Sequence, residues 1–324
     1  MCKIQISETE LRQLLGSEET AEEALQDYFV VDESSPFSTE LRLKPDVEVI
    51  DKDVQVVDED IVYEGRILDT VVHLANAWSV KGRHKRYRDI LEADEDRLRL
   101  VSEGDSWFQH PRVKDTVDHL FNYFAIYSVG AAGDELSNMF RENEYLPALK
   151  NEKARGLLLS GGGNDLMGGR FGEYLDSYTP GVPGEEPRRF LNARFPEKVS
   201  QMMEIYRTIM AHVDSELPAV KVFVHGYDYV RPGRGKSGKW LGIPMEDKGI
   251  RDQHDKEALI KIVIDDFNEE LAKVTADAQN AHFVDVRGTV GLDQWHDEIH
   301  PDEYGFQQVA LKFFRQVTAA FEEE

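Results

Sequence analysis

Cysteine is almost absent from this chain. Cys2 is the single cysteine among 324 residues, so no disulfide can form within one chain and no cysteine cluster can bind a metal there. The first residues turn polar at Ser7 and Glu8 before the hydrophobic segment of a signal peptide could develop. Both observations predict a cytoplasmic protein.

Long apolar runs and positive charge are also scarce. No stretch approaches the roughly 20 apolar residues that cross a bilayer, and 62 acidic residues against 38 basic ones give a formal net charge of -24. This charge disfavours phosphate backbones and anionic membrane surfaces. We therefore expect neither a nucleic acid nor a membrane as partner. One basic cluster lies at 81–88, where nucleic-acid contact competes with the favoured interpretation, a solvated helix end paired with surrounding acids.

The length and the changing sequence pattern indicate two parts. Residues 1–95 are expected to form a helical and extended appendage that serves packing, a cap or an oligomer contact. Capping-box patterns begin at Ser7 and Thr20, residues 32–60 suggest an extended arm or short edge strands, and residues 61–78 have helical spacing. A homo-oligomer is a further expectation.

Residues 96–324 are predicted to form the second and larger domain. Short apolar segments alternate with helical ones, which is typical of a parallel sheet covered on both faces. The expected strands are 98–102, 124–129, 156–160, 219–225 and 282–286, and the main helices lie within 113–123, 196–215, 253–277 and 304–321. Ligands of such sheets bind beyond the carboxyl ends of the strands.

A candidate nucleophile follows the first of these strands. Ser106 stands in Gly104-Asp105-Ser106, where a turn after the strand is expected to expose its hydroxyl. A serine hydroxyl needs a base within hydrogen-bond reach to become an effective nucleophile. The alternative is that Ser106 only caps the next helix, and the remaining motifs decide against it.

The candidate base lies near the other end of the chain. His300 is three residues after Asp297, which can orient the imidazole and stabilise its protonated form. Pro301 would make the approach to the following helix rigid. His296 serves as the contrasting case of a surface histidine beside an acid.

Donors for a negative oxygen are expected on three loops. The backbone N–H of Ser106, the backbone N–H of Gly133 and the side-chain amide of Asn164 are the predicted oxyanion hole. Gly130 is a second candidate for the glycine. Turn formation would equally explain Gly133 and Asn164.

The order of these motifs resembles that of the GDSL/SGNH hydrolase superfamily. Gly104-Asp105-Ser106 looks like its first block, Gly133 its second, Gly162-Gly163-Asn164-Asp165 its third and Asp297 to Pro301 its fifth, so that the likeness runs from about Leu98 to the end. The resemblance implies a three-layer α/β/α sandwich with a mainly parallel five-stranded sheet of flavodoxin-like character. It also implies ester hydrolysis without a cofactor, in a family that includes lipases, thioesterases, carbohydrate acetylesterases and acyltransferases.

Other functions compete with this one. His296 and His300 have the spacing of a zinc helix, but Asp follows the first histidine and Pro301 opposes a helix. Gly235-Lys236-Ser237 ends like a phosphate loop without its opening glycine, and Gly161 to Gly163 lacks the dinucleotide spacing. No metal is therefore expected. A binding module without turnover also remains open.

The predicted substrate is a small acyl ester. Trp107, Tyr227 and Tyr229 could line its pocket, although core packing is an equal alternative for the two tyrosines. The sequence offers no hydrophobic stretch for a lipid interface. We expect a carboxylesterase that acts on short- to medium-chain acyl esters through an acyl-enzyme.

Overall fold

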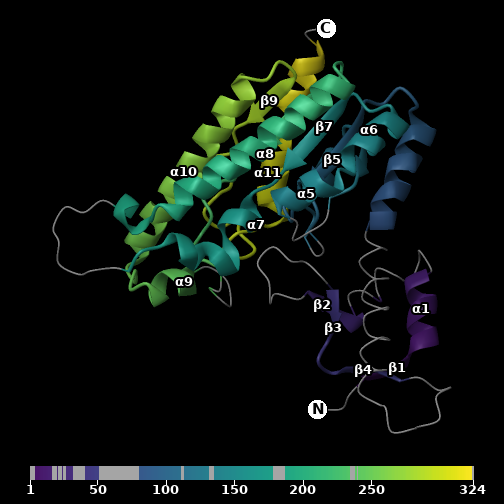
Figure 1. Cartoon of the computed structure of the whole chain (residues 1–324). Helices are drawn as coiled ribbons and strands as arrows, with labels where there is room; N and C mark the ends of the chain where they lie inside the picture. The colour runs from purple at the N-terminus through teal and green to yellow at the C-terminus, as the bar shows by residue number, and fades with distance from the viewer. Residues whose placement is uncertain are drawn as a thin grey trace.

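A five-stranded parallel sheet forms the centre of the structure (Figure 1). The computed structural model describes residues 4–16, 20, 24, 27–31, 41–50, 80–110, 113–130, 135–177, 187–233, 238 and 240–322. The strands are β5 (Arg99–Gly104), β6 (Ala125–Ser128), β7 (Gly156–Ser160), β8 (Lys221–His225) and β9 (Ala281–Val284). All five lie where the sequence predicts them, with ends shifted by a few residues.

The strand order is β6-β5-β7-β8-β9, and every pairing is parallel. This is the 2-1-3-4-5 order of flavodoxin-like doubly wound sheets. β7 is buried along its whole length, as expected of the Leu157-Leu158-Leu159 run in a strand covered on both faces. The predicted fold class is thus confirmed. The strand order reverses between β5 and β7, and folds of this type bind ligands at such a point.

Helices cover both faces of this sheet. Those after β5 are α4 (Thr116–Leu120), α5 (Leu136–Glu142), α6 (Tyr145–Glu152), α7 (Gly163–Leu166), α8 (Arg194–Glu216), α9 (Gly242–Asp247), α10 (Gln253–Ala276) and α11 (Glu303–Glu322), with 3-10 turns η1 (Gly168–Tyr174) and η2 (Pro187–Phe190). α8 and α10 pack against each other in front of the sheet in Figure 1, whereas α11 lies behind it and contacts α4.

The helix ends follow local chemistry. α4 lies within the predicted 113–123, and the Asp115 side chain fixes its start because it accepts hydrogen bonds from the N–H groups of Val117 and Asp118. α10 begins after Asp252, whose side chain accepts from the N–H of Asp255. α8 buries residues at helical spacing from Val199 to Val213, which explains its length.

The N-terminal residues form a separate small cluster. β1 (Ile4–Ser7) pairs in parallel with β4 (Val47–Ile50), β2 (Phe29–Val31) pairs antiparallel with β3 (Leu41–Leu43), and α1 (Glu8–Gly16) follows β1. The first capping prediction is confirmed, because the N–H of Glu10 donates to Ser7 Oγ at 3.1 Å. Most of the second capping box and the predicted helix at 61–78 lie outside the described residues.

A helix over residues 80–93 changes the predicted domain boundary at 95/96. Its Tyr87 belongs to the main hydrophobic core, and its His84 Nε2 lies 2.7 Å from the carbonyl oxygen of Ser128. The Arg83 guanidinium is buried and pairs with Asp115 and Asp118. This helix therefore packs as part of the sheet domain, and Arg83 is not a solvated member of the basic cluster.

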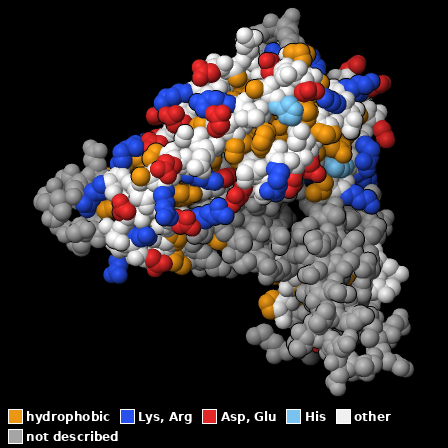
Figure 2. All heavy atoms as spheres, in the orientation of Figure 1, with side chains coloured by type: hydrophobic (Ala, Val, Ile, Leu, Met, Phe, Trp, Pro, Cys, Tyr) orange, Lys and Arg blue, Asp and Glu red, His pale blue; other side chains and the backbone are white. Residues whose placement is uncertain are grey.

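The outer surface carries both signs of charge. Figure 2 shows Lys and Arg side chains interspersed with Asp and Glu over the face that holds α8 and α10. Within the described ranges, no helix is sufficiently long and apolar to cross a membrane.

Candidate active site

Ser106 lies in a tight turn at the carboxyl end of β5. The carbonyl oxygen of Asp105 accepts from the N–H groups of Phe108 and Gln109 at 3.0 and 2.9 Å, which closes the turn. The expectation of an exposed hydroxyl is wrong in this structure, since Ser106 has an exposed fraction of 0%. Its hydroxyl instead forms a buried hydrogen bond.

That hydrogen bond joins Ser106 to the predicted base. Ser106 Oγ is 2.7 Å from His300 Nε2, and His300 Nδ1 is 2.8 Å from Asp297 Oδ2. The structure therefore brings together three residues that the sequence separates by up to 194 positions. This geometry can remove a proton from the hydroxyl as it attacks and can hold the imidazolium that results.

Asp297 is held as a carboxylate. Burial works to raise the pKa of Asp297, but the nearby His300 and the hydrogen bonds from its ring and from the backbone of Ile299 and His300 outweigh burial and hold that pKa well below its ordinary value. The two backbone bonds reach Asp297 Oδ1 at 2.9 and 2.8 Å. One oxygen thus shapes the loop and the other faces the imidazole.

The structure describes two of the three residues that are expected to supply donors to the oxyanion, Ser106 and Asn164. Asn164 is buried in the first turn of α7, directly after β7, at the same end of the sheet as Ser106. Gly133 lies outside the described residues. Gly130 has a packing reason to be glycine, because a Cβ there would come within 2.5 Å of the Gly104 backbone.

A buried hydrogen-bond network connects the Ser106 turn to the Asn164 helix. The hydroxyl of Tyr227 donates to Asp105 Oδ2 and accepts from the N–H of Gly163 at 2.8 Å. Asp105 Oδ1 accepts from the N–H of Trp107 and from the hydroxyl of Ser160, each at 3.0 Å. The network fixes the position of Ser106 relative to the residue before Asn164. Sequence reasoning missed this role of Asp105 and Tyr227 because their partners are distant in the chain.

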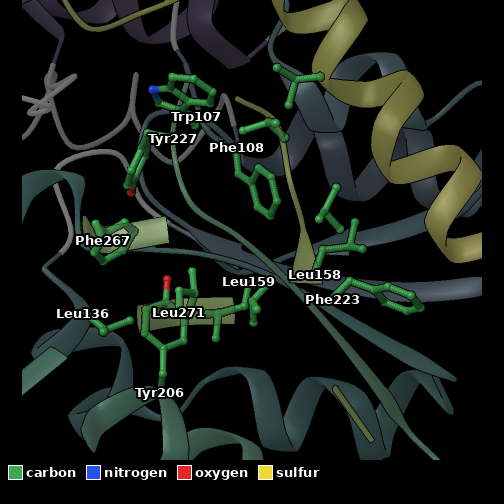
Figure 3. Close-up of a cluster of buried hydrophobic side chains, with 14 of the residues drawn as sticks. Trp107, Phe108, Leu136, Leu158, Leu159, Tyr206, Phe223, Tyr227, Phe267 and Leu271 are labelled. Atoms are coloured by element: carbon green, nitrogen blue, oxygen red, sulfur yellow. The ribbon is translucent and has the colours of Figure 1, made fainter. Parts of the chain in front are cut away.

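The predicted pocket residues have internal partners. Trp107 and Tyr227 are 0% and 1% exposed, and Figure 3 shows their rings side by side in the buried cluster. The Trp107 indole N–H donates to the carbonyl oxygen of Ile299 at 3.0 Å, and the Tyr229 hydroxyl donates to Asp265 at 2.9 Å. These placements do not fit the expected role in lining a substrate pocket. Trp107 instead ties the nucleophile turn to the histidine loop.

The alternative zinc interpretation does not fit the local structure. Residues 291–301 form turns and bends rather than a helix, and both ring nitrogens of His300 face Ser106 and Asp297. In the described part of the chain, the residues grouped like metal ligands are Asp252, His254 and Asp255, which lie at the surface at the start of α10. Gly235-Lys236-Ser237 lies outside the described residues.

A serine, a histidine and an aspartate hydrogen-bonded in series at the carboxyl end of a doubly wound sheet define the site. Neither a protein-family model nor a curated protein matches the sequence. Among solved structures, an extracellular lipase from Streptomyces rimosus is similar at 19% identity and a TM-score of 0.47, over 67% of this chain and 99% of that one. A phospholipase A1 from Streptomyces albidoflavus is similar at 17% identity and a TM-score of 0.46, over 68% and 99%. A carbohydrate esterase of family 3 from Talaromyces cellulolyticus is similar at 12% identity and a TM-score of 0.41, over 70% and 99%.

Proposed function

We propose that this protein is a serine ester hydrolase of the SGNH type. The observation that carries the proposal is the continuous chain of hydrogen bonds from Ser106 Oγ through His300 to Asp297, at 2.7 and 2.8 Å. The order of the motif blocks along the sequence supports the family assignment. A serine activated in this way can hydrolyse esters through a covalent acyl intermediate without a cofactor.

The first half of the reaction forms an acyl-enzyme. Ser106 Oγ attacks the acyl carbon while His300 Nε2 takes the hydroxyl proton, and the carbonyl electron pair moves to its oxygen. When the pair returns, the bond to the leaving oxygen breaks, and His300 gives its proton to the alcohol. Asp297 holds the imidazole and stabilises its charge throughout.

The second half returns the enzyme to its starting state. A water molecule attacks the acyl carbon and gives one proton to His300. The bond to Ser106 Oγ then breaks, the carboxylic acid leaves and His300 returns the proton to Ser106. We assign the stabilisation of the oxyanion in both halves to the N–H groups of Ser106 and Gly133 and to the Asn164 amide.

The proposed substrates are short- to medium-chain acyl esters. Ser106 and His300 are only 0% and 5% exposed, and this burial favours small acyl groups. Carbohydrate acetyl esters, thioesters and transfer to an acceptor other than water are alternatives within the same chemistry. We also propose a cytoplasmic location, and a packing or oligomer role for the residues before 80.

Hydrolysis of a p-nitrophenyl acyl series by the wild type and Ser106→Ala, with and without a chelator, tests the proposal. We expect chelator-insensitive activity that is highest on short chains and falls by at least a thousandfold in Ser106→Ala. Activity that survives the substitution but is lost to the chelator would refute the serine mechanism. An inactive wild type would favour the binding-module alternative.

A further inference from the structure

Glu298, the residue after Asp297, has a buried carboxylate that the proposed reaction does not use. Glu298 is 1% exposed. Its two carboxylate oxygens accept hydrogen bonds from four backbone N–H groups at 2.5 to 3.1 Å, those of Gly233, Trp240, Leu241 and Gly242. Four backbone donors compensate the burial of this charge.

The segment that surrounds Glu298 is shaped for close approach. A Cβ on Gly242 would lie 3.1 Å from Glu298 Oε1, and Gly233 has a φ of +81° that few other residues adopt. The N–H of Arg231 also donates to the carbonyl oxygen of Glu298 at 2.7 Å. The main chain between β8 and α9 thus grips Glu298 by its side chain and by its backbone.

A second carboxylate makes the same kind of contact in the opposite direction. Asp228, which follows β8, is buried and accepts at 2.6 to 2.8 Å from the N–H groups of Gly288, Thr289 and Val290, in the segment that leads to the histidine loop. The β8–α9 segment and the 288–300 segment are therefore joined twice, by one acid from each. We call this pair of contacts the carboxylate clasp.

The clasp acts on the loop that carries the base. In Asp297-Glu298-Ile299-His300, the Asp297 side chain faces the imidazole, Glu298 is held by the β8–α9 segment, and the carbonyl oxygen of Ile299 is held by Trp107. Because Glu298 directly follows Asp297, a displacement of residue 298 is passed along the chain to Asp297. Resting on the proposed function, we infer that Glu298 is a positioning residue that fixes the Asp297–His300 pair at its distance from Ser106.

Glu298→Gln tests this inference with a side chain of nearly the same shape. The amide group keeps one acceptor oxygen and turns an N–H₂ group toward backbone donors, so residue 298 loses two of its four backbone hydrogen bonds. We expect kcat on a p-nitrophenyl acetate substrate to fall at least tenfold, with KM within twofold of the wild type. Glu303→Gln is the matched control, because Glu303 lies on the surface and pairs with Lys114; its kcat should stay within twofold.

A spectroscopic readout separates positioning from general loss of structure. The proton on His300 Nδ1, which points at Asp297, should give a low-field NMR resonance that responds to the geometry of that bond. In a Glu298→Gln protein that circular dichroism shows to be folded, the resonance should shift or broaden, whereas Glu303→Gln should leave it in place. A folded Glu298→Gln protein with wild-type kcat and an unchanged resonance would overturn the inference.

Gly242→Ala provides a milder variant if Glu298→Gln does not fold. Its added Cβ presses on Glu298 Oε1 from outside and keeps the acid, so we expect a smaller fall in kcat and the same direction of resonance shift. An unchanged kcat and resonance in Gly242→Ala would likewise overturn the inference. If the wild type proves inactive on every ester, the proposed function fails, and the resonance still tests the positioning of the pair.

Discussion

Buried oxygen atoms determine the geometry around Ser106. Burial raises the pKa of Asp105, although the hydrogen bonds from Tyr227, Trp107 and Ser160 act to lower it. The Tyr227 hydroxyl is the link between this acid and Gly163, so a single oxygen connects two motif blocks. The position of the nucleophile therefore depends on a residue outside every block that the sequence reveals.

Removing that oxygen should weaken both stability and catalysis. In Tyr227→Phe, the Gly163 N–H and one Asp105 oxygen lose a buried partner, which costs about 1–3 kcal/mol of unfolding free energy. We expect kcat on the p-nitrophenyl ester to fall and KM to change little. Chemical denaturation and steady-state kinetics measure the two effects.

Tyr229→Phe is the control for this substitution. The Tyr229 hydroxyl bonds Asp265 away from the Ser106 turn, and its side chain is partly exposed. Its loss should leave kcat within twofold. Equal kinetic effects in the two variants would contradict the role assigned to Tyr227.

The strands of the sheet could be predicted from the sequence. The contacts that hold the helix over 80–93 and the histidine loop in place could not. Apolar runs such as Leu157-Leu158-Leu159, each followed by glycine or an acid, identify the strands because a parallel sheet buries both faces. The contacts of Arg83 and Glu298 depend on partners that are 25 or more residues away. Nothing in the basic cluster at 81–88 distinguishes a buried arginine from a solvated one, and so the pattern predicts a solvated helix end where Arg83 is buried.

The importance of Arg83 to that helix can be measured directly. Arg83→Ala leaves Asp115 and Asp118 without their cationic partner, and breaking a buried pair in this way costs about 3–5 kcal/mol of unfolding free energy. The exposed Arg88 provides the matched control, with an expected change below about 0.5 kcal/mol for Arg88→Ala. Urea unfolding of both variants compares them. Equal midpoints would show that the helix does not depend on the ion pair.

For the whole molecule, stability should depend on pH through a buried histidine on β8. His225 is 0% exposed among the rings of Trp107, Phe108 and Phe313, and burial lowers its pKa from 6.5 to about 3. The unfolded chain takes up this proton near pH 6.5, but the folded protein does so only near pH 3. The free energy of unfolding therefore decreases as the pH falls from about 6.5 to about 3. The decrease is on the order of 1.4 kcal/mol for each unit by which the two pKa values differ.

His225→Phe should make the protein more tolerant of acid. Phenylalanine fits the aromatic surroundings and takes up no proton, so the decline in unfolding free energy between about pH 6 and pH 4 should become less steep. Urea titrations at several pH values measure the slope. The control is His254→Phe at a side chain that is 91% exposed, where the slope should not change.

If the folded molecule activates Ser106 as a nucleophile, covalent labelling shows it without the choice of a natural substrate. A fluorophosphonate should add once to the wild type, with the adduct located at Ser106 by peptide mass spectrometry. Ser106→Ala should remain unlabelled, and His300→Ala should react at least a hundredfold more slowly. Labelling at another residue would rule out Ser106 as the nucleophile, and equal labelling rates in the wild type and His300→Ala would rule out His300 as its base.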